Sequence, residues 1–378
     1  MSLGPVVWEQ IRQGRPPDPE LVDGLVEQHK AVLGDGGGRT LGRRVRSAVF
    51  GAGPLDEFIA GVGVTDVAVN GDGSVWVDRG LGMQRAPLTL AADEVHELAL
   101  RLAGAAGRRL DESAAFVDGL LPSGVRLHAI LPPLVPDGPH VTLRVPGRAP
   151  RSLGDLVEGG ALPAPWKPVL VGLVRRRVSF LVSGGTGAGK TTLLAALLGL
   201  SLGTDRVVVV EDVRELVVDH AHVVHLEGRP ANVEGVGAVT LTTLVRQALR
   251  MRPDRLVVGE VRGPEVRELL NALNTGHQGG CGTVHANSAP DVVARVEALG
   301  ALAGLSREAV QAQLASAVEA LVHLRRVGAT RRVESVAVLD VGSDRIPRVV
   351  EALGRDENGA PTTGPGWPSL ARRCGVPE

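Results

Sequence analysis

The sequence predicts an α/β protein of two domains, a small α+β domain followed by a larger domain with a mainly parallel sheet. The chain has 378 residues, more than one ordinary hydrophobic core needs. Apolar and polar residues alternate in its first half, whereas continuous apolar runs alternate with helical segments in the second. A stretch rich in Pro and Gly, residues 146–165, lies between the two and predicts a linker.

The first domain is expected to carry an antiparallel sheet. Residues 1–50 mix polar and apolar positions at helical spacing and predict an N-terminal helical extension. From residue 51 the pattern alternates, and the turn Gly71-Asp-Gly73 predicts a hairpin. The elements expected in the α+β domain of residues 51–145 are strands at residues 66–70, 75–78, 125–131 and 141–145 and a helix at residues 92–106.

The second domain, residues 166–345, is expected to have strands buried on both faces. Its short apolar runs, bounded by turn residues and separated by helical patterns, are typical of parallel sheets. The expected strands are at residues 178–182, 207–210, 256–258, 282–284, 320–327 and 332–339, and the expected helices at 193–200, 291–302 and 307–318. Residues 346–378 are rich in Gly and Pro and predict a flexible C-terminal tail.

Composition limits the classes of partner and compartment. The net charge of -1 gives no overall electrostatic reason to bind nucleic acid or anionic lipid. Two cysteines, Cys281 and Cys374, lack metal-type spacing and fit a reducing compartment. No signal peptide is expected, and the most apolar stretch, residues 193–202, is far shorter than the roughly 20 residues of a membrane-spanning helix. We therefore expect a cytoplasmic protein that contacts membranes only peripherally.

A phosphate-binding loop is the most specific local feature. Residues 184–191 read Gly-Gly-Thr-Gly-Ala-Gly-Lys-Thr, a complete GxxxxGK[ST] pattern between an expected strand and an expected helix. Lys190 should reach the β- and γ-phosphates and the Thr191 hydroxyl should hold Mg²⁺, so the expected ligand is Mg²⁺ with ATP. The residues expected to bind the nucleotide are Gly184, Gly185, Thr186, Gly187, Ala188, Gly189, Lys190, Thr191 and Thr192.

Acidic side chains follow two of the expected strands. Glu211 follows residues 207–210, and Glu260 follows residues 256–258 after Gly259. Because ligands bind at the carboxyl ends of parallel strands, both carboxylates should face the phosphates. Glu260 is the expected base that activates water. Thr191, Glu211 and Glu260 are the residues expected to hold Mg²⁺ or the waters bound to it. Gly259 stands where a general P-loop protein has the Asp that supports Mg²⁺.

Two histidines lie in a glycine-rich segment, residues 274–288. We expect His277 and His285 to sense the γ-phosphate by hydrogen bonding, with ordinary structural histidines as the alternative. A zinc site is not expected, because nothing nearby completes a ligand set with Cys281.

Several of these segments together resemble the secretion ATPases of type II secretion, type IV pili and type IV secretion. The segment Glu211-Asp-Val-Arg-Glu-Leu216 is similar to the Asp box of these ATPases, and residues 251–265 are similar to their atypical Walker B motif. Their His box is similar to Thr275-Gly-His-Gln-Gly together with Thr283-Val-His-Ala-Asn-Ser288. Further segments are similar to the tight-adherence (Flp pilus) branch, namely Val69-Asn-Gly71, Leu121-Pro-Ser-Gly-Val-Arg126, Ile130-Leu-Pro-Pro-Leu134 and Val141-Thr-Leu-Arg144. The likeness covers roughly residues 40–345.

The resemblance implies a homohexameric ring in which a PAS-like N-terminal domain closes on a RecA-like P-loop domain. The family usually has Gly-Glu where this chain has Gly259 and Glu260. The residues with catalytic roles implied by the family motifs are Glu260, Lys190 and Glu211, with Arg126 and Arg144 approaching phosphate or ribose. Surface arginines on an edge strand are the alternative for the last two.

The resemblance also implies an ATP-hydrolysing motor that acts on an inner-membrane platform protein to drive pilin assembly or protein export. Two rival hypotheses are a conjugation-associated DNA-transfer ATPase and a nucleotide-sensing scaffold with little turnover. Nucleic acid is not the expected partner, since the chain has no basic excess and no Tyr for base stacking.

Overall fold

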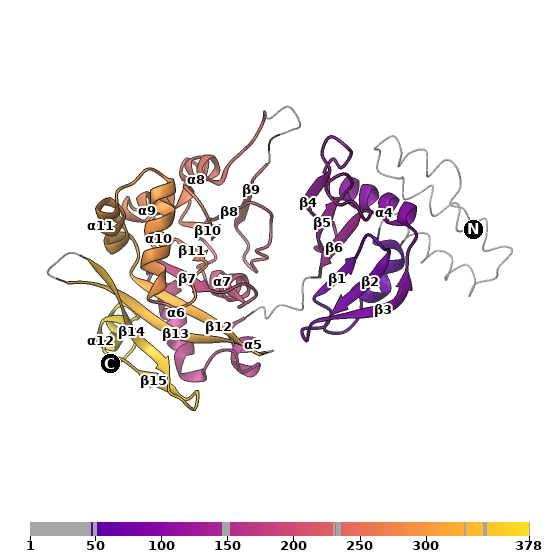
Figure 1. Ribbon diagram of the computed structural model, residues 1–378. Helices are drawn as coiled ribbons and strands as arrows, with labels where there is room; N and C mark the ends of the chain where they lie inside the picture. Colours follow the sequence, from indigo (N-terminus) through magenta and orange to yellow (C-terminus); the bar gives the residue numbers. More distant parts are fainter. Residues whose placement is uncertain are drawn as a thin grey trace. The chain divides into compact units, whose positions relative to one another are not determined.

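The computed structural model describes Ser47 and residues 51–145, 152–229, 231, 236–328, 330–342 and 346–377. The chain divides into two compact units between residues 148 and 149, and each unit is described by itself (Figure 1). The helical extension expected at residues 1–50 lies, apart from Ser47, outside the described residues, as does the first part of the expected linker. Among the described residues, no helix is long and apolar enough to cross a membrane.

The described part of the N-terminal unit contains one antiparallel sheet of six strands in the order β3-β2-β1-β6-β5-β4. The elements are η1 (Gly53–Leu55), α3 (Asp56–Ile59), β1 (Asp66–Val69), β2 (Ser74–Asp78), β3 (Met83–Thr89), α4 (Ala92–Ala105), β4 (Phe116–Leu120), β5 (Arg126–Ile130) and β6 (His140–Arg144). The expected α+β domain with its hairpin and helix is confirmed. Strands β3 and β4 were not expected.

The local sequence explains this sheet. Residues alternate between partly exposed and buried along β1, and Val67 and Val69 join a core with Leu98 and Leu102 of α4. Gly73 in the β1–β2 turn has a φ of +76°, and a Cβ there would lie 1.8 Å from the carbonyl oxygen of Leu90, so only glycine fits. Strand β3 does not show an alternation of apolar and polar residues, because it is an exposed edge strand that contains a proline.

The described part of the C-terminal unit is built on a nine-stranded sheet in the order β15-β14-β13-β12-β7-β11-β10-β8-β9. The pairings from β12 to β9 are parallel, and those from β12 to β15 are antiparallel. The strands are β7 (Phe180–Gly184), β8 (Val207–Glu211), β9 (Val223–Glu227), β10 (Arg255–Val261), β11 (Cys281–Val284), β12 (Ala320–Val327), β13 (Thr330–Val341), β14 (Pro347–Arg355) and β15 (Pro361–Thr363). The expected mainly parallel sheet is confirmed.

Helices cover both faces of this sheet (Figure 1). They are α5 (Leu153–Glu158), α6 (Lys167–Arg175), α7 (Lys190–Leu198), α8 (Leu241–Leu249), α9 (Glu265–Asn274), α10 (Asp291–Leu302), α11 (Arg307–Ala317) and α12 (Trp367–Cys374), with the short η2 (Ala164–Trp166) before α6. Strand β8 shows the two faces directly, because Val207 and Val209 pack in one core and Val208 and Val210 in the other. This burial explains its continuous apolar sequence.

The linker expected at residues 146–165 is structured from Ser152 onward. The Ser152 side chain caps α5 by accepting a hydrogen bond from the backbone N–H of Asp155. Leu153 and Leu156 are buried in the same core as Trp166. The later part of the expected linker therefore belongs to the C-terminal domain, because its prolines and glycines lie between side chains that are buried in the core of that domain.

The prediction of a flexible tail at residues 346–378 is wrong. Strand β14 pairs with β13, and Leu353, Leu370 and Cys374 are buried in the core. Helix α12 packs on α6 so closely that a Cβ on Gly172 would lie 2.4 Å from the carbonyl oxygen of Cys374. The glycines and prolines of this segment end a strand and begin a helix, and they do not keep the chain flexible.

Candidate nucleotide site

The phosphate loop follows β7, inside the parallel part of the sheet. Gly184, Gly187 and Gly189 all have positive φ, and a Cβ on Gly184 would lie 2.5 Å from the carbonyl oxygen of Leu324. Helix α7 begins at Lys190, with left-handed Gly189 as its N-cap. The loop therefore directs a helix N-terminus to the carboxyl edge of the sheet, an arrangement that suits a phosphate.

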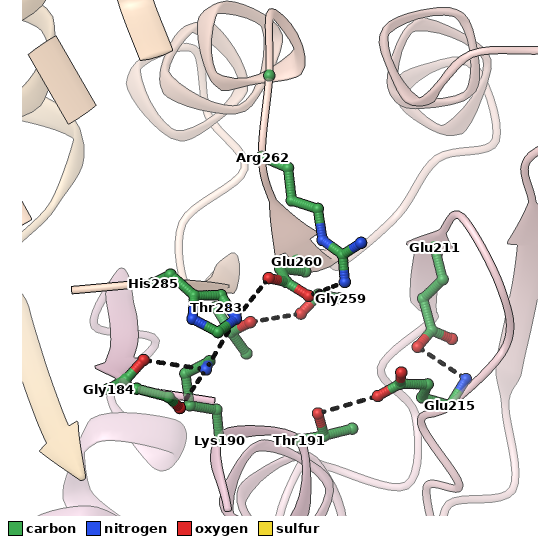
Figure 2. Close-up of polar contacts among 12 residues, drawn as sticks. Gly184, Lys190, Thr191, Glu211, Glu215, Gly259, Glu260, Arg262, Thr283 and His285 are labelled. Atoms are coloured by element: carbon green, nitrogen blue, oxygen red, sulfur yellow. Dashed lines mark hydrogen bonds and ion pairs between the residues drawn. The ribbon is translucent and has the colours of Figure 1, made fainter. Parts of the chain in front are cut away.

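Lys190 is held at the base of this loop. Its Nζ donates to the carbonyl oxygens of Gly184 at 3.0 Å and Gly185 at 2.9 Å, and it lies 3.3 Å from His285 Nε2 (Figure 2). Burial lowers the pKa of Lys190, an effect that Glu260 opposes and Arg262 reinforces. A phosphate anion in the loop would offer the ammonium group an opposite charge that carbonyl oxygens cannot supply.

Glu260 lies at the end of β10 among cationic groups. Its Oε1 is 2.8 Å from His285 Nε2, and its Oε2 accepts a hydrogen bond from Arg262 Nη2 (Figure 2). Burial by itself would raise the pKa of Glu260, but the hydrogen bond and charge of Arg262, with His285 and Lys190, outweigh it and lower the pKa. The carboxylate is therefore ionised at neutral pH beside Lys190.

His285 directly follows β11 and lies between Lys190 and Glu260. Burial and the charge of Lys190 lower its pKa, whereas Glu260 raises it, and the net shift is downward. The imidazole is therefore neutral at neutral pH, and Nε2 either donates to Glu260 or accepts from Lys190. A cavity of about 450 Å³ opens beside it, bordered by Gly185 and by Arg295 of α10.

Glu211 has a different position from the one expected. It is 5% exposed, and its Oε1 accepts hydrogen bonds from the backbone N–H groups of Glu215 and Leu216, each at 3.0 Å. Its side chain also lies over Gly259, where a Cβ would be 2.5 Å from Glu211 Cγ. The space of the missing Asp side chain is therefore filled by Glu211, which explains the glycine.

The carboxylate beside Thr191 belongs to Glu215, which was not among the expected site residues. Thr191 Oγ1 lies 3.4 Å from Glu215 Oε2, on the loop that Glu211 holds (Figure 2). A hydroxyl and a carboxylate are oxygen ligands of the kind that Mg²⁺ prefers, so the residues present fit this ion. The missed signal was Glu215, the third acidic residue of the segment Glu211 to Leu216.

His277 does not join this site, which corrects the expectation that both histidines contact the nucleotide. Gly279, two residues after it, donates from its backbone N–H to the hydroxyl of Ser179, which lies just before β7 begins. Strands β7 and β11 are parallel, so this loop is at their amino ends. His285 and the phosphate loop lie at the carboxyl ends, a full strand length away. The two histidines are close in sequence but lie at opposite ends of strand β11.

Arg126 and Arg144 belong to the N-terminal unit. They are direct partners in the β5–β6 pairing and therefore share a face of that sheet. Arg144 Nε donates to Asp66 Oδ1 at 3.2 Å. The structure thus brings the two arginines together within their own unit, and their approach to a nucleotide stays a prediction.

Comparisons with known proteins agree with this fold. The family model described as "Type II/IV secretion system protein" matches residues 50–351. The chain is 50% identical over 315 residues to a putative conjugal transfer protein of Mycobacterium tuberculosis, covering 81% of this chain and 90% of that one. It is 33% identical over 279 residues to the conjugal transfer protein TrbB of Rhizobium radiobacter, covering 72% and 83%. A solved structure of the pilus retraction motor PilT with bound ADP shares the fold, with a TM-score of 0.54, 22% identity and coverage of 79% and 80%.

Proposed function

The chain belongs to the family of type II/IV secretion system proteins, and from this premise we propose that it is a motor that hydrolyses ATP to ADP and phosphate. One observation carries the proposal: an ionised Glu260, a neutral His285 and Lys190 meet beside the phosphate loop. A protein that only sensed nucleotide would not need a carboxylate placed there. The scaffold hypothesis is therefore the weaker one.

The chemistry follows from the positions of these groups. The loop N–H groups and Lys190 would hold the β- and γ-phosphates, and Lys190 would exchange the carbonyls of Gly184 and Gly185 for phosphate oxygens. Thr191 and Glu215, with Glu260 on the other side of the loop, would face Mg²⁺, which supplies positive charge for the phosphates, while Glu211 holds the segment that carries Glu215.

Glu260 would accept the proton of the attacking water or orient it. Its lowered pKa keeps it ionised and ready to accept a hydrogen bond from water at neutral pH. His285 touches both Glu260 and Lys190, so loss of the γ-phosphate would change its hydrogen bonds first. Arg126 and Arg144 of the N-terminal unit would add charge that approaches the phosphates or ribose, which in P-loop enzymes is worth about 10³-fold or more in rate.

As the output of this cycle we propose movement of an inner-membrane platform protein by a homohexameric ring at the cytoplasmic face of the membrane. Pilin assembly in a tight-adherence system or protein export would be driven by it. The motif likeness to the tight-adherence branch supports this assignment.

Conjugative DNA transfer is a second candidate, and the printed descriptions of the M. tuberculosis and R. radiobacter relatives favour it. The two outputs differ in a measurable way. Turnover stimulated by single-stranded DNA would support transfer of DNA, whereas stimulation by cytoplasmic loops of a co-encoded membrane protein, without effect of DNA, would support the pilus or export machine.

The experiment that tests the ATPase itself is phosphate release with Mg²⁺-ATP by wild type and Glu260→Gln. We expect the variant to lose about 10²-fold or more in kcat while keeping nucleotide affinity. Size in solution, measured in parallel, checks that both proteins form the same ring-sized species. Equal turnover in the two proteins would remove Glu260 from its role, and tight binding without turnover in both would favour the scaffold.

A further inference from the structure

Two arginines of the β12–β13 hairpin lie against the phosphate loop. Arg326 Nη1 is 3.7 Å from the position that a Cβ on Gly187 would occupy. Arg331 Cδ is 3.7 Å from the position that a Cβ on Gly189 would occupy. The hairpin therefore covers the loop at the glycines that bend around a phosphate, although it is more than 130 residues away along the chain.

The pairing of the hairpin sorts its arginines onto two faces. Arg326 is the direct partner of Arg331, and Arg325 is the direct partner of Arg332. Partners on an antiparallel pair share a face, and like charges directly opposite each other are destabilising. On the face of Arg325 and Arg332, Glu334 offsets this repulsion, with distances of 3.8 Å and 2.8 Å to the two guanidinium groups. On the face of Arg326 and Arg331, Arg326 Nε donates to the carbonyl oxygen of Gly328 at 3.1 Å, and the phosphate loop lies beside both side chains.

The sheet order fixes which part of a nucleotide these arginines would meet. Strand β12 flanks β7 on one side, and β11 and β10 lie on the other. His285 and Glu260 follow β11 and β10, so the γ-phosphate belongs on that side of the loop. The hairpin consequently faces the remaining part of the ligand, the α- and β-phosphates and the ribose.

We propose that Arg326 and Arg331 form a second cationic wall of the nucleotide site that contacts the diphosphate and ribose of ADP and ATP alike. This assignment rests on the proposed function of the phosphate loop as an ATP site. Guanidinium groups suit the role, because they bind phosphate oxygens in a bidentate manner. Since these contacts do not involve the γ-phosphate, they would persist after hydrolysis and retain ADP in the site.

Calorimetric titration of Mg²⁺-ADP into the full-length chain tests the proposal. We expect Arg326→Ala and Arg331→Ala each to weaken ADP binding about 10-fold, and the double variant more, as for a lost hydrogen bond to a charged group. Arg325→Ala and Arg332→Ala change the same residue type on the other face of the hairpin and should bind ADP within about twofold of wild type. The ADP and ATP affinities should fall by the same factor.

Two results would overturn the assignment. One is a double variant that binds ADP as tightly as wild type. The other is an equal loss in the Arg325→Ala and Arg332→Ala controls, which would mean that the hairpin only needs to be intact. Failure of the ATP-site proposal itself looks different, because wild type would then bind neither ADP nor ATP.

Discussion

Gly259→Ala is the substitution with the most direct consequence for the site. The added Cβ would lie 2.5 Å from Cγ, 3.0 Å from Oε1 and 3.1 Å from Cδ of Glu211, so the Glu211 side chain must move. Moving it breaks the hydrogen bonds that Oε1 accepts from the backbone N–H groups of Glu215 and Leu216. Each bond to a charged acceptor contributes about 1.5–3 kcal/mol, so the domain should lose about 3 kcal/mol or more of unfolding free energy.

The same movement should reduce turnover, because the loop that places Glu215 beside Thr191 loses its anchor. Urea unfolding and phosphate release measure the two effects. Gly203→Ala is the matched control, since a Cβ on Gly203 meets nothing within 4 Å. It should leave stability unchanged or raise it by about 0.4–1 kcal/mol.

A double-mutant cycle identifies the cause. Glu211→Ala alone removes the same hydrogen bonds, so Gly259→Ala should cost almost nothing in the Glu211→Ala background. The coupling energy should then be close to the whole cost of the single Gly259 change. If the two changes add, or if Gly259→Ala unfolds like wild type, then the space over Gly259 is not what fixes the Glu211 side chain.

Other predictions concern pH, a buried ion pair and the two histidines. Because its neighbours lower the pKa of Glu260 from an ordinary 4.5, protonation of Glu260 should reduce kcat only below about pH 4.5, and an acidic limb centred near pH 6 in the His285→Ala variant, where His285 cannot titrate, would contradict this. Asp205→Ala leaves Arg255, which is 2% exposed, without its buried carboxylate and should cost about 3–5 kcal/mol in urea unfolding, whereas a cost below 1 kcal/mol would contradict the pairing. In steady-state phosphate release, His277→Ala should stay within about twofold of wild type, and His285→Ala should lose about 10-fold or more.

Sequence reasoning found what local chemistry determines. The phosphate loop, the helix at residues 291–302 and the strand at residues 320–327 were placed correctly because each carries its own pattern of glycine, apolar period or continuous apolar run. Position at a strand end was enough to place Glu260 beside the phosphate loop. The C-terminal strand and helix were missed because glycine and proline content suggested flexibility, whereas here these residues allow close packing.

Side-chain positions within the site required the tertiary structure. Two histidines eight residues apart look like one unit in the sequence, but β11 runs between them. It places His277 at the amino ends of the parallel strands and His285 at their carboxyl ends. Glu211 was expected beside Mg²⁺ because it directly follows a strand, but the fold turns Glu215 toward Thr191 and uses Glu211 to hold the loop. The arginines of the β12–β13 hairpin carried no sequence signal, since only the pairing of β12 with β7 brings them to the loop.

The strand order explains why a histidine connects the lysine to the carboxylate. Lys190 follows β7 and Glu260 ends β10, but β11 lies between these strands. Neighbouring strands are about 4.8 Å apart, so two such steps separate β7 from β10 by about 10 Å, too far for direct contact between short groups at their ends. A side chain at the end of β11 lies midway, and His285 reaches both, at 3.3 Å and 2.8 Å. The γ-phosphate would enter this same gap, so a group on β11 meets it whichever residue activates the water.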